Sequence, residues 1–345
     1  MREGGGPLAR TDEELLELAG RLNNAGRWGP ADELGTLNHI SASKRVEAAA
    51  LVRLGLTVSL ARPLIRESVP SAAVELDRRL MASARPDPHS GMPPFAADYV
   101  GMEMHQQGVT HIDALGHVGG ADGCAYGGRS FGEALDEEGL RFGSVFAQRD
   151  GIVSRGVLLD VPAALGLRWL EPSHEISPAD LEAAELHAGV RLARGDVLVL
   201  RAGVEARERA LGPSALASGP GPDAAAWMHA REIALYTGDA PEHITAVGAR
   251  ILGRAEGSRD GDAGRDGDDG DGGRDGDGQP AATRFPLAFH QLALAAMGLV
   301  LLDHARVEPL AETCRELGRY EFLFVAAPLA LPGGTGSPVN PLAIF

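Results

Sequence analysis

The sequence predicts a mixed α/β fold in a single domain. Segments with helix start and stop residues alternate with short apolar, β-branched runs. The composition, 44% hydrophobic and 23% charged, is close to that of an ordinary globular protein. Apart from one Asp/Gly-rich segment, no change in composition and no internal repeat divides the 345 residues. We therefore expect one domain over residues 1–345, with an insertion at that segment.

Residues 11–200 contain two predicted helices and three predicted strands. The capping box T-D-E-E at residues 11–14 precedes leucines at helical spacing and predicts a helix to about Asn24. Runs rich in β-formers at 57–60, 156–161 and 197–200 predict strands. Ser177 as N-cap, Pro178 at the first helical position and Gly189 as the stop predict a helix over Pro178–Ala188.

The second half continues the mixture of helix and strand. Helices are predicted at about Asp223–Tyr236 and Glu308–Leu317, and a strand over the apolar residues Tyr320–Ala326. The Gly/Pro-rich stretch Pro332–Pro338 predicts a loop. The longest apolar run, Leu292–Leu302, has eleven residues, about half of the roughly 20 that a membrane-spanning helix needs, so we expect it in the core.

Charge and terminal composition exclude several classes of partner. A formal net charge of −16 opposes binding to nucleic acid, where affinity depends on neutralising phosphates. No membrane segment is expected, and the first residues lack the apolar region of a secretory signal, so we expect a cytoplasmic protein.

Cys124 and Cys314 lie far apart and belong to no C-x-x-C pair, which predicts reduced thiols.

The Asp/Gly-rich segment Gly257–Gly278 has almost no apolar side chains. It holds nine Gly, eight Asp and three Arg, and its net charge is −5. Because it cannot bury enough surface to offset its ordering entropy, we predict a disordered insertion. The alternative is a calcium loop, but no register supplies the EF-hand set of carboxylates, glycine and final glutamate.

The densest chemical pattern lies at residues 104–117, M-H-Q-Q-G-V-T-H-I-D-A-L-G-H. If residues 109–113 are extended, His105, Gln107, His111 and Asp113 project to one face. Imidazole and carboxylate groups are ligands for zinc and similar divalent ions, so this face is a candidate metal site. His117 follows where the strand should end, and its ordinary pKa suits a general base. Ordinary hydrogen-bonded histidines are the structural alternative.

Residues 110–117, T-H-I-D-A-L-G-H, closely resemble the T-H-x-D-A-x-x-H signature of the cyclase family of metal-dependent hydrolases. That family includes bacterial kynurenine formamidase and isatin hydrolase. Residues 27–38, R-W-G-P-A-D-E-L-G-T-L-N, are similar to its N-terminal element. Y-E-F-L at 320–323 and P-G-G-T-G-S-P-V-N-P at 332–341 are similar to its closing stretch. The resemblance therefore spans nearly the whole chain.

The resemblance implies further site residues and one departure. His290 and Asp303 match the family's second ligand region, and Trp28 is expected to lie over an aromatic substrate. The family pattern H-x-G-T-H-x-D begins with a histidine ligand where this chain has Gln107. Gln is a poor zinc ligand, so His105 takes that place through a bulge, or the site binds one ion weakly or a harder ion such as Mn²⁺.

The resemblance also implies a fold, an activity and an assembly. The fold is a central, barrel-like or swivelling β-sheet flanked by helices, in a homodimer or homotetramer. The activity is arylformamidase-like hydrolysis of an aryl formamide or cyclic amide, with one or two Zn²⁺ or Mn²⁺ ions activating water and His117 moving the proton. The alternatives are a ring-forming or ring-opening cyclase of secondary metabolism, and a non-catalytic small-molecule binder with a degenerate metal site.

Overall fold

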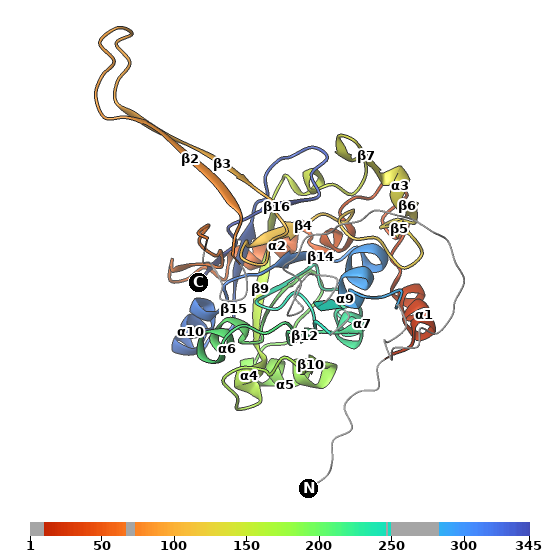
Figure 1. The fold of residues 1–345 in the computed structure, drawn as a ribbon. Helices are drawn as coiled ribbons and strands as arrows, with labels where there is room; N and C mark the ends of the chain where they lie inside the picture. Colours follow the sequence, from red (N-terminus) through yellow and green to blue (C-terminus); the bar gives the residue numbers. More distant parts are fainter. Residues whose placement is uncertain (1–9, 67–72, 246–247, 250–282) are drawn as a thin grey trace.

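A curled sheet of nine strands forms the centre of the molecule (Figure 1). This computed structural model describes residues 10–66, 73–245, 248–249 and 283–345, so the Asp/Gly-rich segment Gly257–Gly278 lies outside the described residues. In spatial order the strands are β1 (Thr57–Ser59), β17 (Leu342–Ile344), β15 (Glu321–Ala326), β9 (Ile152–Asp160), β11 (Val197–Arg201), β13 (Leu235–Gly238), β14 (Val300–Asp303), β4 (His111–Asp113) and β16 (Gly336–Pro338). The expected mixed α/β fold with a barrel-like sheet is confirmed.

Four neighbouring parallel strands, β9, β11, β13 and β14, form the middle of the sheet. Every residue of β11, β13 and β14 is buried, as is typical of parallel strands covered on both faces. The remaining pairs are antiparallel, and β4 lies between β14 and β16. The carboxyl end of β14 therefore meets the start of β4, where Asp303 pairs with His111.

The helices lie around this sheet. Four two-stranded sheets accompany them among the described residues: β2 (Leu76–Ser83) with β3 (Phe95–Met102), β5 (Cys124–Ala125) with β6 (Arg129–Ser130), β7 (Leu135–Asp136) with β8 (Gly139–Leu140), and β10 (Glu175–Ile176) with β12 (Gly219–Pro220). The helices are α1 (Asp12–Leu22), η1 (Gly35–His39), α2 (Ala42–Ala49), α3 (Phe131–Ala134), η2 (Val145–Gln148), α4 (Val161–Ala164), α5 (Pro178–Ala188), α6 (Val204–Leu211), α7 (Pro222–Ala230), α9 (Ala288–His290), the π-helical η3 (Gln291–Met297) and α10 (Glu308–Leu317). Helices α2, α5 and α10 all contact β9. Among the described residues, no helix is both long enough and apolar enough to cross a membrane.

Two expected elements end differently in the structure. The helix expected to reach Tyr236 stops at Ala230, because the chain turns at Glu232 and the next residues enter the sheet as β13. The loop expected over Pro332–Pro338 ends in β16, which pairs with β4. In both cases a partner strand distant in the sequence decides the conformation, which local propensity does not report.

The apolar run Leu292–Leu302 lies in the core as expected, but it belongs to two elements. It begins in η3, turns at Gly298 with a positive φ of 63°, and ends in β14. A Cβ atom on Gly298 would lie 2.5 Å from the ring of Tyr126, so glycine is required there by both conformation and space.

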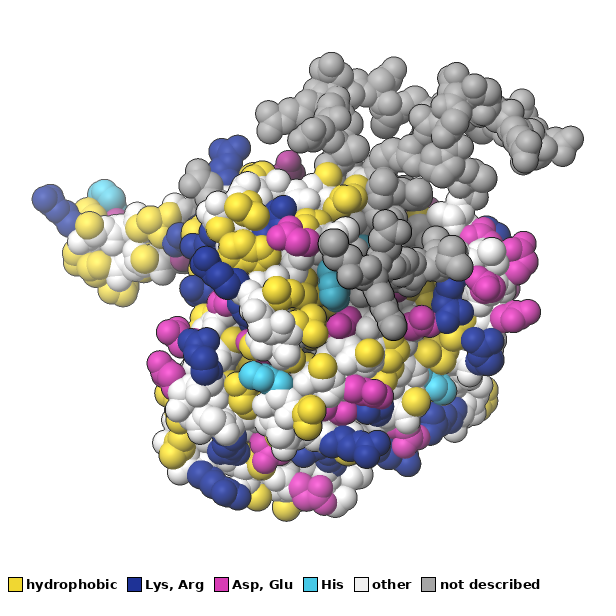
Figure 2. Space-filling model, turned by 90° about the horizontal axis from the view of Figure 1, so that it is seen from below, with side chains coloured by type: hydrophobic (Ala, Val, Ile, Leu, Met, Phe, Trp, Pro, Cys, Tyr) yellow, Lys and Arg dark blue, Asp and Glu magenta, His cyan; other side chains and the backbone are white. Residues whose placement is uncertain are grey.

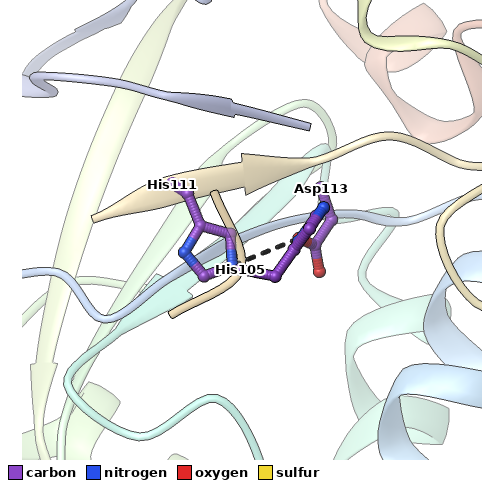
Figure 3. Close-up of side chains that lie close together, drawn as sticks. All are labelled: His105, His111 and Asp113. Atoms are coloured by element: carbon purple, nitrogen blue, oxygen red, sulfur yellow. Dashed lines mark hydrogen bonds and ion pairs between the residues drawn. The ribbon is translucent and has the colours of Figure 1, made fainter. Parts of the chain in front are cut away.

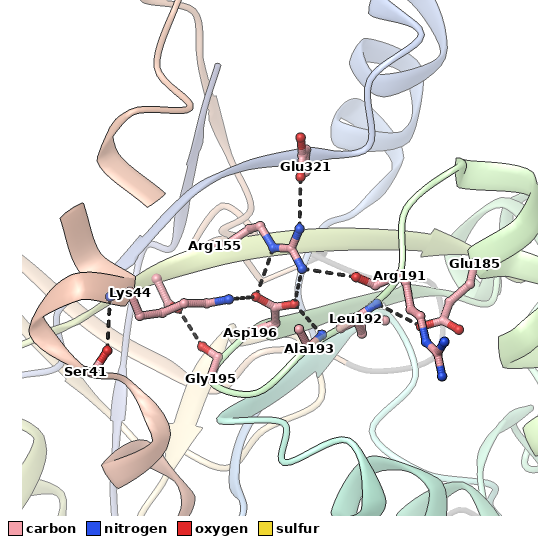
Figure 4. Close-up of polar contacts among 11 residues, drawn as sticks. Ser41, Lys44, Arg155, Glu185, Arg191, Leu192, Ala193, Gly195, Asp196 and Glu321 are labelled. Carbon is pink, nitrogen blue, oxygen red and sulfur yellow. Dashed lines mark hydrogen bonds and ion pairs between the residues drawn. The ribbon is translucent and has the colours of Figure 1, made fainter. Parts of the chain in front are cut away.

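A buried ionic cluster connects α2, β9 and the start of β11 (Figure 4). Asp196, fully shielded from solvent, accepts hydrogen bonds from Arg155 at 2.6 and 3.0 Å and lies 2.5 Å from the ammonium of Lys44. Lys44 is the only lysine of the chain. Glu321 contacts the outer side of Arg155 at 3.1 Å. Two cations thus share one carboxylate that water does not reach.

Candidate metal centre

Strand β4 positions two of the candidate ligands (Figure 3). His111 and Asp113 project to one face, while Ile112 between them is buried in the hydrophobic core. His111 Nε2 lies 3.4 Å from Asp113 Oδ1, and His111 Nδ1 lies 2.9 Å from the Val109 carbonyl oxygen. The contact with the Val109 carbonyl orients the imidazole so that Nε2 faces Asp113.

His105 reaches the same place from a turn. The strand β4 begins at His111 and does not extend back to His105, so strand alternation does not place this side chain. The ring nonetheless converges on the site, with Nδ1 3.0 Å from Asp113 Oδ1 and Nε2 3.2 Å from Thr335 Oγ1. A Cβ atom on Gly336 would lie 2.7 Å from this ring, so the glycine of β16 leaves room for it. His105 thus lies beside His111 and Asp113, while Gln107 contributes to the cavity wall.

A second group of potential ligands shares Asp113 with the first. His290 ends α9, and Asp303 ends β14. His290 Nε2 lies 3.1 Å from Asp303 Oδ2 and 3.8 Å from Asp113 Oδ2. In each group, His105 with His111 and Asp113, and Asp113 with His290 and Asp303, the donor atoms lie within 4.8 Å of one another. The two groups have the geometry of adjacent cation sites joined by one carboxylate.

Glu242 is a site residue that the sequence reasoning missed. It follows β13, is 3% exposed, and lies with Oε1 3.1 Å from His290 Nδ1. Its other oxygen accepts a hydrogen bond from the backbone N–H of Phe289 at 3.1 Å. The imidazole of His290 therefore has Glu242 on one side and Asp303 on the other. No motif pointed to Glu242, because it is 48 residues from His290 in the sequence.

Histidines are the partners of the buried carboxylates in this site, and each group shifts the pKa of the other. Burial disfavours the charged form of Asp113, but His117, His105 and His111 outweigh burial and hold its pKa well below its usual range. Burial also lowers the pKa of His290, yet Glu242 and Asp303 outweigh it and hold that pKa well above its ordinary value. The site is thus a cluster of buried carboxylates paired with imidazoles.

The residues present fit a divalent cation. Asp113 Oδ2 and Asp303 Oδ1 are buried and have no hydrogen-bond partner among the described residues. The surrounding cavity has a volume of about 440 Å³, and none of the described residues that line it is Lys or Arg. Buried carboxylate oxygens without a hydrogen-bond partner are costly, and oxygen and imidazole donors together suit a divalent metal ion.

His117 lies in the same cavity and follows the strand, as expected. Its backbone N–H donates to Ala114 in the turn after β4. Its ring stacks on His105, with centroids 3.6 Å apart and planes 3° from parallel. Burial lowers the pKa of His117 to about 4, despite the opposing effect of Asp113. The imidazole is therefore neutral near pH 7, and its ring lies beside the candidate ligands.

Trp28 does not reach this cavity in the single chain. It is half-buried, packs edge to face on His39 with centroids 5.1 Å apart, and is not among the residues that line the cavity. The neighbouring motif residue Thr36 donates a hydrogen bond to the Ala234 carbonyl at 2.8 Å, and Asp32 accepts from Tyr126 at 2.9 Å. Thr36 and Asp32 therefore connect this segment to the rest of the fold, and substrate binding by Trp28 stays a prediction.

The chain belongs to the cyclase family, whose Cyclase model matches residues 52–243. A crystal structure described as that of a novel cyclase is 28% identical, covers 94% of this chain and 100% of that one, and has a TM-score of 0.73. Isatin hydrolase A from Ralstonia solanacearum is 18% identical over 87% of this chain and 94% of its own, with a TM-score of 0.50. An isatin hydrolase bound to the product analogue thioisatinate is 16% identical over 88% and 99%, also at 0.50. A comparison with curated protein sequences gives no match.

Proposed function

We propose that the protein is a metal-dependent hydrolase that cleaves the C–N bond of an aryl formamide or a cyclic amide. The observation that carries this proposal is the convergence of two donor groups on Asp113, with buried carboxylate oxygens that have no hydrogen-bond partner among the described residues. Membership of the cyclase family and a fold shared with two isatin hydrolases support the choice of substrate class.

In this proposal the two donor groups hold one or two Zn²⁺ or Mn²⁺ ions. His105, His111 and Asp113 form one group, and His290 and Asp303 join Asp113 in the other. A bound divalent ion would supply Lewis acidity and lower the pKa of water to about 7. The protein keeps the donors oriented: the Val109 carbonyl faces His111 and the Glu242 carboxylate faces His290.

His117 is the proposed proton carrier. It is held by its stacking on His105 and opens into the cavity, where the substrate carbonyl would lie. From this position beside the candidate ligands it accepts the proton of the attacking water and returns it to the leaving nitrogen. The cavity volume of about 440 Å³ lies within the range for small-molecule sites and accommodates a substrate with one or two rings.

Metal analysis and a substrate panel test the proposal together. Full-length protein prepared without chelator and supplied with Zn²⁺ or Mn²⁺ is expected to hold at least one ion per chain and to hydrolyse members of a panel of formylated anilines and cyclic imides. Asp113→Asn is expected to lose metal and activity together, whereas Asp150→Asn, at an exposed carboxylate, keeps both. Far less than one ion per chain would favour the small-molecule binder. Metal without hydrolysis of any panel member would favour a ring-forming or ring-opening reaction.

A further inference from the structure

His304 enters the cavity of the metal centre through an unusual backbone turn. It follows Asp303, the last residue of β14, and has a φ of 57°. Among the described residues, Glu232 is the only other residue except glycine with a positive φ. Successive side chains of a strand point to opposite faces, so a continued strand would turn His304 away from the face of Asp303. The left-handed conformation instead places His304 among the residues that line the cavity.

Buried side chains hold this backbone conformation. The carbonyl oxygen of His304 accepts hydrogen bonds from Arg62 Nε and Thr110 Oγ1, both at 2.9 Å. Arg62 in turn pairs with Glu205 at 2.7 Å, and both of these side chains are more than nine-tenths buried. A left-handed conformation is unfavourable for a residue other than glycine, and such strain persists mainly at functional sites, where the surrounding structure enforces it. The fixed backbone therefore points to a role for the His304 side chain.

The imidazole of His304 lies beside the candidate ligands but belongs to neither donor group. Its ring centroid is 5.8 Å from that of His111, with the ring planes at 42°. The donor groups found among the described residues include His105, His111 and His290, and not His304. The proposed proton carrier, His117, stacks on His105. His304 is thus a histidine of the cavity that neither the donor groups nor the proposed proton carrier accounts for.

The cavity wall offers a substrate few other side-chain hydrogen-bond donors. Figure 2 shows basic and acidic side chains mixed over one face of the molecule, whereas no Lys or Arg is among the described residues that line the cavity. The side-chain amide of Gln106 is engaged with backbone groups of Glu75 and Glu103 at 2.6 to 3.0 Å. Besides the histidines already assigned, Gln107 and His304 remain as donors among the described lining residues. Of these two, His304 is the one whose backbone the buried side chains fix.

We infer that His304 binds the amide carbonyl of the substrate, by donating a hydrogen bond from its imidazole to the carbonyl oxygen. This inference rests on the proposed function. The reacting amide has to lie near the candidate ligands, and His304 lies there. The apolar part of the lining consists of Val118, Pro241, Ile244 and Leu287 and suits the ring of the substrate. A donor that is fixed before the substrate arrives stabilises the negative charge that develops on the carbonyl oxygen during hydrolysis.

Two substitutions that tolerate a positive φ test the inference. His304→Gly removes the imidazole without backbone strain, and His304→Asn keeps a side-chain N–H donor. His304→Gly is expected to keep its metal content and to lose about 10²- to 10³-fold in kcat on the best panel substrate, as is typical when one donor to a developing oxyanion is removed. His304→Asn is expected to recover about tenfold of this loss. Thermal unfolding checks the fold of each variant.

Glu232→Gly is the matched control. It changes the other left-handed residue, which does not line the cavity, and should keep both metal and activity. If the wild type hydrolyses a panel member and His304→Gly stays within about threefold of its kcat, the inference is wrong and the proposed function stands. The inference is also wrong if His304→Gly loses metal as Asp113→Asn does, or if Gln107→Ala loses more activity than His304→Gly.

Ligand binding decides the case in which the wild type hydrolyses no panel member and the proposed function fails. Calorimetric titration of the zinc-loaded protein with phthalimide, a cyclic imide, then measures the contact without any reaction. Binding that is at least about tenfold weaker in His304→Gly than in the wild type would support the contact. Equal binding by the two proteins, or no binding by the wild type, would overturn it.

Discussion

Substitution of Glu242 by alanine removes the carboxylate that faces His290 Nδ1 at 3.1 Å. We expect the affinity for Zn²⁺ to fall, because the imidazole loses the partner that keeps Nε2 directed at Asp303 and Asp113. Losing such an outer carboxylate typically weakens metal binding by about 10- to 100-fold. The expected change in binding free energy is therefore about 1.4 to 2.7 kcal/mol.

The same substitution also changes the free energy of unfolding, and this change has to be measured separately from the change in Zn²⁺ affinity. The N–H of Phe289 loses its acceptor, which costs about 1–3 kcal/mol when the donor stays buried. Removal of a buried negative charge offsets part of this cost. Glu242→Gln keeps an acceptor for the Phe289 N–H and is expected to bind Zn²⁺ within about tenfold of wild type.

Competition with a chromogenic chelator measures the Zn²⁺ affinity, and chemical denaturation measures the stability of the same samples. Asp239→Asn is the matched control: this buried carboxylate accepts backbone hydrogen bonds from Ala202, Gly203 and Val204 but does not line the cavity. It should lose stability and keep its Zn²⁺ affinity. Wild-type affinity in Glu242→Ala would refute the positioning argument, and a loss as complete as in Asp113→Asn would show that Glu242 is itself a ligand.

His117→Ala is expected to keep its metal content and lose about 10²- to 10⁴-fold in kcat, whereas His111→Ala loses metal and activity together. Equal metal loss in both variants would make His117 a ligand. Asp196→Asn leaves two half-buried cations without their buried carboxylate and is expected to cost about 3 kcal/mol in urea unfolding, against less than about 1 kcal/mol for Glu321→Gln at the cluster edge. Burial lowers the pKa of His39 to about 4 in the folded chain, whereas its ordinary value in the unfolded chain is about 6.5. Between these two values, His39 binds a proton in the unfolded chain but not in the folded one. Stability should therefore fall by about 2 kcal/mol from about pH 6.5 to about pH 5, and His39→Gln should flatten this slope.

The elements predicted correctly are those whose ends are set by residues close by in the sequence. Helix α1 begins at the capping box of Thr11 and Glu14, and α5 begins at Ser177 and ends at the left-handed Gly189. Each of these features acts within one helical turn of the residues it organises. A sequence window of that length therefore contains the physical cause of the boundary.

The candidate site residues also differ in how far a local pattern could place them. The strand His111–Asp113 places its two polar side chains on one face because alternation is a property of the strand itself, and the motif sufficed to find them. The motif also resembled the cyclase family closely enough to bring in His290 and Asp303. His105 was named as the substitute for the ligand missing at Gln107, but a turn beside Thr335 and Gly336 brings it to Asp113, instead of the extended strand that the alternation assumed.

The sequence by itself determined the class of fold, the local helix boundaries and the polar face of β4, because these follow from periodicity, capping and residue type. Only the tertiary structure decided that residues 235–238 form a central strand, that β16 pairs with β4, and that Glu242 faces His290. These outcomes depend on burial and hydrogen bonding between segments tens to hundreds of residues apart. The contacts that stabilise them form only when the sheet assembles, so a short stretch of sequence does not predict them.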